Sequence, residues 1–202
     1  MSKSPAGNII DLYQRNAQAW DDARGRSLLE KSWLDRFIEL LSPSGSVVDI
    51  GCGAGVPITG YLLSRGLAVT GIDSASAMIE RCIGRFPSAE FQVADMRTLA
   101  LHRRFDGLIA WDSFFHLTAE DQRGMFPIFA AHAAENAALL FISGPEHGEA
   151  IGTFEGEPLY HASLAPAEYR SLLDGAGFNV VETVSEDPTC GGHTVWLARK
   201  RR

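Results

Sequence analysis

The sequence predicts an α/β protein built on a single doubly wound sheet, and three observations support this fold class. Short apolar runs typical of strands alternate with helix-like segments of about ten residues along most of the chain. A glycine cluster directly follows the first apolar run, and the last two runs are joined without a helical segment. Alternating strands and helices imply βαβ units, which build a parallel sheet with helices on both faces. We therefore expect a seven-stranded sheet, mostly parallel, with an antiparallel last strand.

The first 44 residues predict helices that form an N-terminal cap. Apolar residues recur at helical spacing over Ile10–Trp20 and again over Ser27–Leu41. The segment 42–45, of sequence SPSG, ends the second helix because proline and glycine rarely continue one.

The remaining elements follow from β-branched runs between turn residues and from apolar residues at helical spacing. Strands are expected at 46–50, 67–72, 89–93, 105–111, 138–143, 178–184 and 194–199, and helices at 57–65, 75–85, 122–134 and 166–175. No repeat, low-complexity tract or linker divides the chain, so residues 1–202 are expected to form a single domain.

Residues 144–163 are expected to form a long loop on the substrate side of this domain. Glycines recur there at four-residue spacing, at Gly144, Gly148, Gly152 and Gly156. A loop of this length in a compact domain is usually functional.

Composition argues against several classes of protein. A formal net charge of -7 leaves no large basic surface for nucleic acid, so a small-molecule partner is expected. The three cysteines lack metal-ligand spacing, which predicts no metal site and a reducing compartment. No apolar run approaches the roughly 20 residues that cross a bilayer, and the N-terminus lacks a signal-peptide core. We expect a cytoplasmic protein without membrane contact, as a monomer or a homodimer.

The strongest local signal is the segment 47–55, of sequence VVDIGCGAG, between the first strand and the next helix. Glycines let the backbone turn tightly and approach a ligand closely, so this segment predicts a nucleotide-like ligand. Asp73 ends the second strand eighteen positions after Gly55, about where such sheets present an acid to a ribose diol. A nicotinamide-dependent dehydrogenase fits these features equally well.

Four motifs in order resemble those of class I, Rossmann-like, S-adenosylmethionine-dependent methyltransferases that act on small molecules. They are VVDIGCGAG at 47–55, GIDSASAMI at 71–79, VADMRTL at 93–99 and FDGLIAWDSFFHL at 105–117. The resemblance implies S-adenosyl-L-methionine as the methyl donor, S-adenosyl-L-homocysteine as the product, and an acceptor that the sequence does not identify.

The resemblance also implies roles for particular residues. Asp49 is expected to stabilise the glycine loop and the donor's amino group, and Asp73 to hold the ribose hydroxyls. Asp95 is expected to accept from the adenine amino group. The other cofactor-binding residues implied are Gly51, Gly53 and Trp111 near the methionine portion, Met96 near adenine, Tyr13 in the cap, and Cys52, Ser74 and Met78. For Tyr13, packing in the core remains an alternative.

His116 and His161 are the candidates for a general base, because histidine accepts protons near neutral pH. Phe115 stands where the commonest small-molecule members carry an acid, which suggests an apolar wall for the substrate. Two other functions stay open at this point. One is an NAD(P)-dependent Rossmann oxidoreductase, and the other is a non-catalytic protein that binds S-adenosylmethionine.

Overall fold

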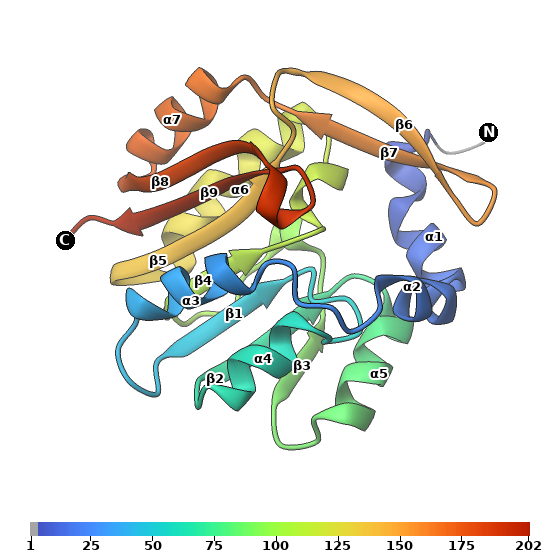
Figure 1. Ribbon diagram of the computed structural model, residues 1–202, viewed down its shortest axis with the longest axis horizontal. Coiled ribbons are helices and arrows are strands. Elements are labelled where there is room, and N and C mark those ends of the chain that lie inside the picture. Colours follow the sequence, from blue (N-terminus) through green and yellow to red (C-terminus); the bar gives the residue numbers. More distant parts are fainter. Residues whose placement is uncertain (1–3) are drawn as a thin grey trace.

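The computed structural model describes residues 4–202 and contains a seven-stranded sheet with helices on both faces (Figure 1). The strands of this sheet are β1 (Ser46–Ile50), β2 (Ala68–Asp73), β3 (Glu90–Val93), β4 (Phe105–Ala110), β5 (Ala133–Ser143), β8 (Phe178–Asp187) and β9 (His193–Lys200). Their order across the sheet is β3-β2-β1-β4-β5-β9-β8. The predicted α/β fold class is confirmed.

Strand direction also follows the prediction. Strands β1 to β5 pair in parallel, whereas β9 pairs antiparallel with both β5 and β8. The connection from β8 to β9 contains only a short 3-10 turn, η4 (Pro188–Cys190), and is too short for a crossover. The antiparallel last strand is therefore confirmed.

Helices cover the sheet in two layers. They are α3 (Lys31–Glu39), α4 (Ile58–Ser64), α5 (Ser76–Arg85), α6 (Ala119–His132) and α7 (Pro166–Gly175), with 3-10 turns η2 (Met96–Thr98) and η3 (Phe114–His116) in the connections. Val47 packs with Trp33 of α3, and its neighbour Val48 packs with Phe129 of α6. Successive strand residues thus enter opposite cores, as the two-residue period of a strand requires. These cores hold the carboxyl ends of the strands in fixed positions.

The N-terminal helices differ from the prediction. The expected helix Ile10–Trp20 divides at Asn16 into α1 (Ile9–Arg15) and α2 (Ala17–Arg24), because the backbone of Asn16 leaves the helical conformation. Helix α3 begins only at Lys31 and belongs to the core beside the sheet. The cap is therefore residues 6–24, comprising η1 (Ala6–Asn8), α1 and α2, and not the whole of residues 1–44. The first three residues of the expected domain and cap lie outside the described part.

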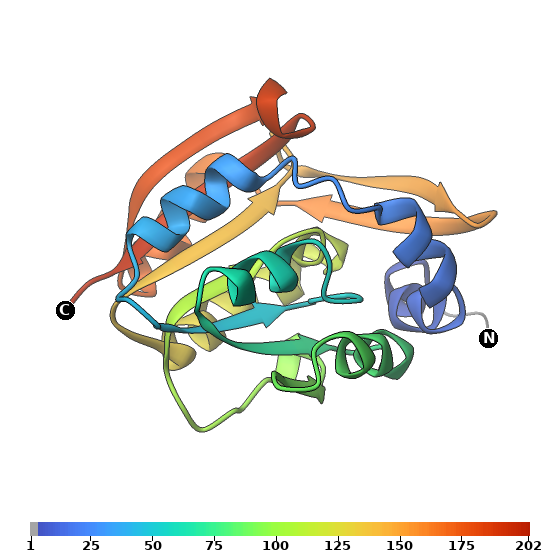
Figure 2. The ribbon, with the colours of Figure 1, turned by 60° about the horizontal axis from the view of Figure 1, so that its bottom comes forward.

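The expected loop 144–163 is instead mostly a β-hairpin. Its strands β6 (Gly148–Phe154) and β7 (Glu157–Ser163) pair along their whole length. Glu155 and Gly156 form the turn with positive φ angles, as two-residue hairpin turns require. The hairpin was not predictable from the sequence, because most of β6 is exposed. Strand β6 therefore lacks the alternation of apolar and polar residues that marks a strand with one buried face. Figure 2 shows the hairpin reaching over the cap, which lies beside α5.

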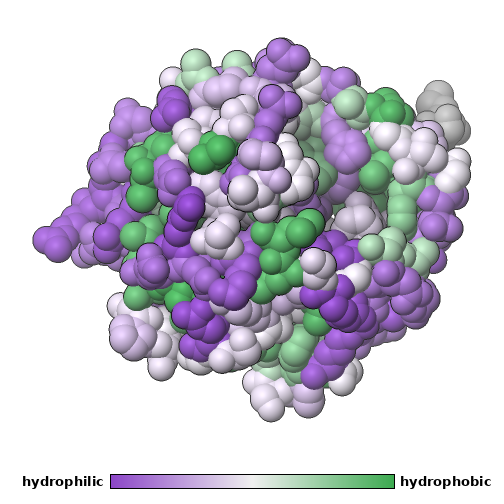
Figure 3. Space-filling view, in the orientation of Figure 1, coloured by the Kyte–Doolittle hydropathy of each residue, from purple (hydrophilic) through white to green (hydrophobic). Residues whose placement is uncertain are grey.

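The surface is mixed in character. In the view of Figure 3, apolar residues form small separate patches among polar ones. Within residues 4–202, no helix has the length and apolar character needed to cross a membrane.

Candidate functional site

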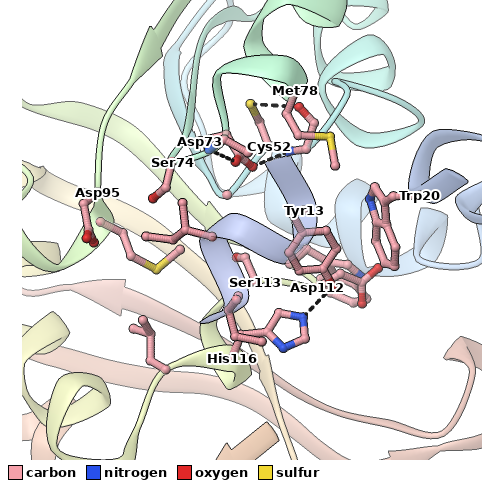
Figure 4. A pocket seen from close by; sticks show the side chains of 18 of the residues that line it. Tyr13, Trp20, Cys52, Asp73, Ser74, Met78, Asp95, Asp112, Ser113 and His116 are labelled. Atoms are coloured by element: carbon pink, nitrogen blue, oxygen red, sulfur yellow. Dashed lines mark hydrogen bonds between the residues drawn. The ribbon is translucent and has the colours of Figure 1, made fainter. Parts of the chain in front are cut away.

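A cavity of about 320 Å³ lies where β1, β2 and β4 end, beneath the cap (Figure 4). Of the predicted site residues, those that line it are Tyr13, Asp49, Gly51, Cys52, Gly53, Asp73, Ser74, Met78, Asp95, Met96, Trp111 and His116. His161 does not line it. Parallel strands present their carboxyl ends at one edge of the sheet, so residues from four separate motifs meet here.

The glycine loop after β1 leaves no room for side chains. A Cβ at Gly51 would lie 2.2 Å from the Cβ of Ser113, and the φ of Gly51 is +79°. Ser113 is fixed there because its hydroxyl donates to the Ile50 carbonyl at 2.7 Å. A Cβ at Gly53 would meet Trp20 of the cap at 3.4 Å. Backbone therefore forms this wall of the cavity.

Asp49 is a buried carboxyl group on the cavity wall. Its Oδ2 accepts a hydrogen bond from the Thr59 hydroxyl at 2.5 Å. Burial raises the pKa of Asp49 to about 7, although the Thr59 hydrogen bond opposes this shift. A cationic group in the cavity would favour the ionised carboxylate.

Asp73 joins the glycine loop to the start of α5. Its carboxylate accepts from the backbone N–H of Gly53 at 3.0 Å and of Ala75 at 2.8 Å. Burial nevertheless raises the pKa of Asp73 to about 6. Each carboxylate oxygen has a further lone pair, so Asp73 retains capacity to accept from ligand hydroxyl groups.

Asp95 is held by a neighbouring arginine. The Arg97 guanidinium donates to both oxygens of Asp95, at 2.6 Å for the shortest contact, and lowers the pKa of Asp95. The same carboxylate accepts from the backbone N–H of Arg97 and caps η2. A ligand amino group at Asp95 would therefore share this carboxylate with Arg97.

Tyr13 and His116 form a hydrogen-bonded pair at the opposite wall (Figure 4). The Tyr13 hydroxyl lies 2.8 Å from His116 Nε2, and His116 Nδ1 lies 2.8 Å from the Tyr160 carbonyl. Because a carbonyl only accepts, Nδ1 carries the proton, and Nε2 of the neutral ring accepts from Tyr13. Burial lowers the pKa of His116 to about 4. Burial and the nearby Asp112 raise the pKa of Tyr13, which keeps its phenol protonated.

His161 and Phe115 lie away from the cavity, contrary to the positions expected for a base and a substrate wall. The ring of His161, on β7, packs 4.9 Å from the ring of His116. Phe115 packs against both histidines, at centroid distances of 4.7 Å and 5.1 Å. Neither residue lines the cavity, and both contact His116 from outside it.

The cavity residues that sequence reasoning missed include Trp20, Arg24 and Asp112. Arg24 of the cap pairs with the buried Glu30 at 2.5 Å and with Asp112 at 3.1 Å. Asp112 has a φ of +49°, an unusual backbone conformation for a non-glycine residue that often marks a functional site. The sequence carries a weak signal for Asp112 alone, an acid directly after the fourth strand.

A search of residues 4–202 finds no group of three or more histidine, cysteine, aspartate or glutamate side chains placed to hold a metal ion.

A family model described as a methyltransferase domain matches residues 47–136, which contain the glycine loop, Asp73, Asp95 and His116. This part of the chain is therefore similar to a methyltransferase domain. The described fold agrees with solved methyltransferases over nearly the full chain. Magnesium protoporphyrin IX methyltransferase from Synechocystis PCC 6803, with bound S-adenosylmethionine, superposes with a TM-score of 0.75 at 18% identity, covering 98% of each chain. An amino pentose methyltransferase from Micromonospora echinaspora gives a TM-score of 0.71 at 19% identity, covering 91% of this chain and 95% of that chain.

The curated proteins that resemble this chain are longer than it. Trans-aconitate 2-methyltransferase of Paracidovorax citrulli is 45% identical over 62 residues, which are 30% of this chain and 24% of the relative. Phosphoethanolamine N-methyltransferase 1 of Zea mays is 30% identical over 164 residues, which are 76% of this chain and 32% of the relative. The chain spans less than two thirds of the length of these relatives.

Proposed function

We propose that this protein binds S-adenosyl-L-methionine and transfers its methyl group to a small-molecule acceptor. The observation that carries the proposal is the convergence of the glycine loop, Asp49, Asp73 and Asp95 on one cavity at the carboxyl edge of the sheet. Solved neighbours with bound S-adenosylmethionine or S-adenosylhomocysteine support the same donor. When bound, the donor supplies a methyl group already activated on a sulfonium sulfur.

The charges of the cavity suit this donor, which carries a sulfonium and an amino group. Asp49 is nearly fully buried and accepts a hydrogen bond from the Thr59 hydroxyl. Because a buried charge is unfavourable without a partner, the donor's ammonium group would compensate the charge of the ionised carboxylate. Gly51 and Gly53 line the cavity and carry no side chain of their own, so their backbone can approach the methionine portion. We assign the ribose hydroxyls to Asp73. The remaining assignments are adenine to Asp95 and Met96, and further contacts to Tyr13, Cys52, Ser74, Met78 and Trp111.

Tyr13 and His116 are proposed as the proton acceptors of the reaction. An acceptor with an O–H or N–H group must lose a proton when it is methylated. Tyr13 Oη lines the cavity and donates to His116 Nε2, so it takes the acceptor's proton as its own proton moves to Nε2. His116 is neutral at physiological pH because burial lowers its pKa to about 4, and its Nε2 lone pair is available. We propose no separate role for His161 in proton transfer.

The experiment has a binding stage and a turnover stage. Calorimetric titration compares S-adenosylhomocysteine with NADH, and we expect micromolar binding of the first alone. Preference for NADH would instead favour the oxidoreductase alternative.

In the second stage, a panel of small amines, phenols and carboxylic acids is incubated with S-adenosylmethionine, and formation of S-adenosylhomocysteine is measured. We expect turnover with a panel member, and a kcat about 100-fold lower in Tyr13→Phe and His116→Gln. Binding without turnover across the panel would favour the non-catalytic alternative.

We propose that the protein works in the cytoplasm. The free thiols of Cys52, Cys82 and Cys190 are compatible with a reducing cytoplasm. A monomer or homodimer that binds no nucleic acid stays a prediction from composition, open to size-exclusion measurements and gel-shift assays.

A further inference from the structure

The cap docks onto α5 through a row of polar side chains. Gln14 of α1 accepts from the backbone N–H of Ala77 at 3.2 Å, at the N-terminal end of α5. One turn further along the cap, Gln18 accepts from Arg81 at 2.8 Å. Asp21 follows in the next turn of α2. This row, Gln14, Gln18 and Asp21, is called the cap seam below.

Asp21 is the charged centre of the cap seam. It is only 2% exposed, and the guanidinium groups of Arg85, Arg81 and Arg26 converge on its carboxylate. The hydrogen bond from Arg85 lowers the pKa of Asp21, so the carboxylate is ionised at neutral pH. The side chains of Arg85, Arg81 and Arg26 are 27%, 28% and 57% exposed, so salt can reach these ion pairs from the arginine side. Removing one partner leaves the other charge without compensation, which is destabilising.

Arg85 also holds the glycine loop. Its Nη1 donates to the Ala54 carbonyl at 2.8 Å, while its Nη2 binds Asp21. Cys82, one turn earlier on α5, donates to the Gly53 carbonyl at 3.1 Å. One guanidinium therefore bridges the cap and the loop that borders the cavity.

The cap seam contains an unpaired buried nitrogen, and this unfavourable feature is relieved when the cap moves away. Arg81 Nε is the one buried side-chain nitrogen or oxygen, among the residues described, that lacks a hydrogen-bond partner. A buried unpaired N–H is unfavourable, and exposure to water would satisfy it. The closed cap is thus held by the charge of Asp21 against this cost.

Trp20 connects the cap seam to the cavity. It precedes Asp21 on α2, lines the cavity, and lies beside Gly53. Movement of Asp21 away from Arg85 would therefore move Trp20 away from the glycine loop and open this wall.

We propose that Asp21 is a positioning residue that, through Arg85, holds the cap closed over the cavity and sets the rate at which the adenosyl ligand leaves. This inference rests on the proposed binding of S-adenosylmethionine. Asp21 contacts neither the cavity nor the reacting atoms; it acts through Arg85, Trp20 and the glycine loop.

The test measures the release rate of S-adenosylhomocysteine by stopped-flow fluorescence in the wild type, Asp21→Asn and Asp22→Asn. Asp22 is the matched control because it is the exposed neighbour on α2, and its carboxylate accepts from Gln18 of the cap seam but forms no ion pair with Arg81 or Arg85. We expect release to be at least about tenfold faster in Asp21→Asn, with little change in the association rate or in Asp22→Asn. Asp21→Glu should restore part of the slow release.

The salt dependence of the release rate separates this electrostatic role from a purely structural one, which salt would not affect. Potassium chloride should accelerate release from the wild type and leave release from Asp21→Asn nearly unchanged, because salt screens the ion pair. Wild-type release rates in Asp21→Asn would overturn the proposal, as would an equal effect in Asp22→Asn. Failure of the wild type to bind S-adenosylhomocysteine would overturn the proposed function as well.

If Asp21→Asn does not fold, the proposal is tested by amide hydrogen exchange in the wild type. Amides of α2 should gain protection when S-adenosylhomocysteine binds, and high salt should reduce that gain. Unchanged protection of α2 would overturn the proposal.

Discussion

Asp49 illustrates how one buried residue couples the fold to ligand binding. Its carboxyl group lies between the first strand and the glycine loop, where solvent is excluded, and the Thr59 hydroxyl donates a hydrogen bond to it. Desolvation raises its pKa to about 7, so a large share of the ligand-free protein carries a neutral Asp49 at neutral pH. In the ligand-free protein, the pKa of Asp49 is higher in the folded state than its value of about 4 in the unfolded chain. Protonated Asp49 therefore contributes to the free energy of unfolding fully below about pH 4, and this contribution is lost as the pH rises through about 7.

Ligand binding should show the opposite dependence on pH. An ammonium group of S-adenosylhomocysteine requires the ionised carboxylate, so the affinity should fall as pH drops below about 7, by at most about tenfold per pH unit. Calorimetry from pH 5.5 to 8, in buffers of different ionisation enthalpy, should detect proton release on binding. Asp49→Asn should bind more weakly and lose the part of the pH dependence near pH 7, leaving that of Asp73, whose pKa is about 6. An unchanged pH profile in Asp49→Asn would contradict this assignment.

The hairpin β6–β7 shows where reasoning from sequence reaches its limit for whole elements. The central strands of the main sheet were predictable because both of their faces are buried, which gives runs such as VVDI in β1. The exposed ribbon has no such constraint, and its glycines favoured a loop. For the same reason, the motif residues of the cavity were predictable from the strand ends that carry them. The Asp21–Arg85 contact was not, since it joins residues 64 positions apart without a motif.

Phe154 at the tip of β6 provides a test of the hairpin's role. Its ring stacks on Tyr13 at 6.0 Å and meets Trp20 edge-on at 5.8 Å, so it supports two cavity residues from above. Phe154→Ala should weaken S-adenosylhomocysteine binding about fivefold, since such aromatic contacts contribute about 1 kcal/mol. Ile151→Ala is the control, because Ile151 lies on the same strand and is exposed. Equal affinities in the two variants, measured by calorimetry, would show that the hairpin does not support the site.

At the scale of the whole molecule, a firmly packed sheet carries a less firmly packed rim, which consists of the cap and the hairpin β6–β7. Both faces of the sheet are covered by fully buried side chains, and a buried hydrogen bond of 2.8 Å from Trp33 to Asp187 ties α3 to the last two strands. The cap is attached by polar contacts with α5, aromatic contacts with the hairpin, and a small apolar cluster that includes Ala17 and Met78. This cluster is much smaller than the two cores of the sheet, so the rim should be the less stable part of the ligand-free protein.

A ligand that closes this rim should stabilise the whole protein through mass action. At a concentration 100 times its Kd, S-adenosylhomocysteine should add about 2.7 kcal/mol to the free energy of unfolding. For a chain of 202 residues this corresponds to a rise in Tm of about 5–10 °C, measurable by differential scanning calorimetry. NADH at the same concentration should leave the Tm unchanged, because the cavity is assigned to the adenosyl ligand. A larger shift with NADH would mean that the carboxylates at the sheet edge serve a nicotinamide cofactor, and the methyl-transfer proposal would fail with them.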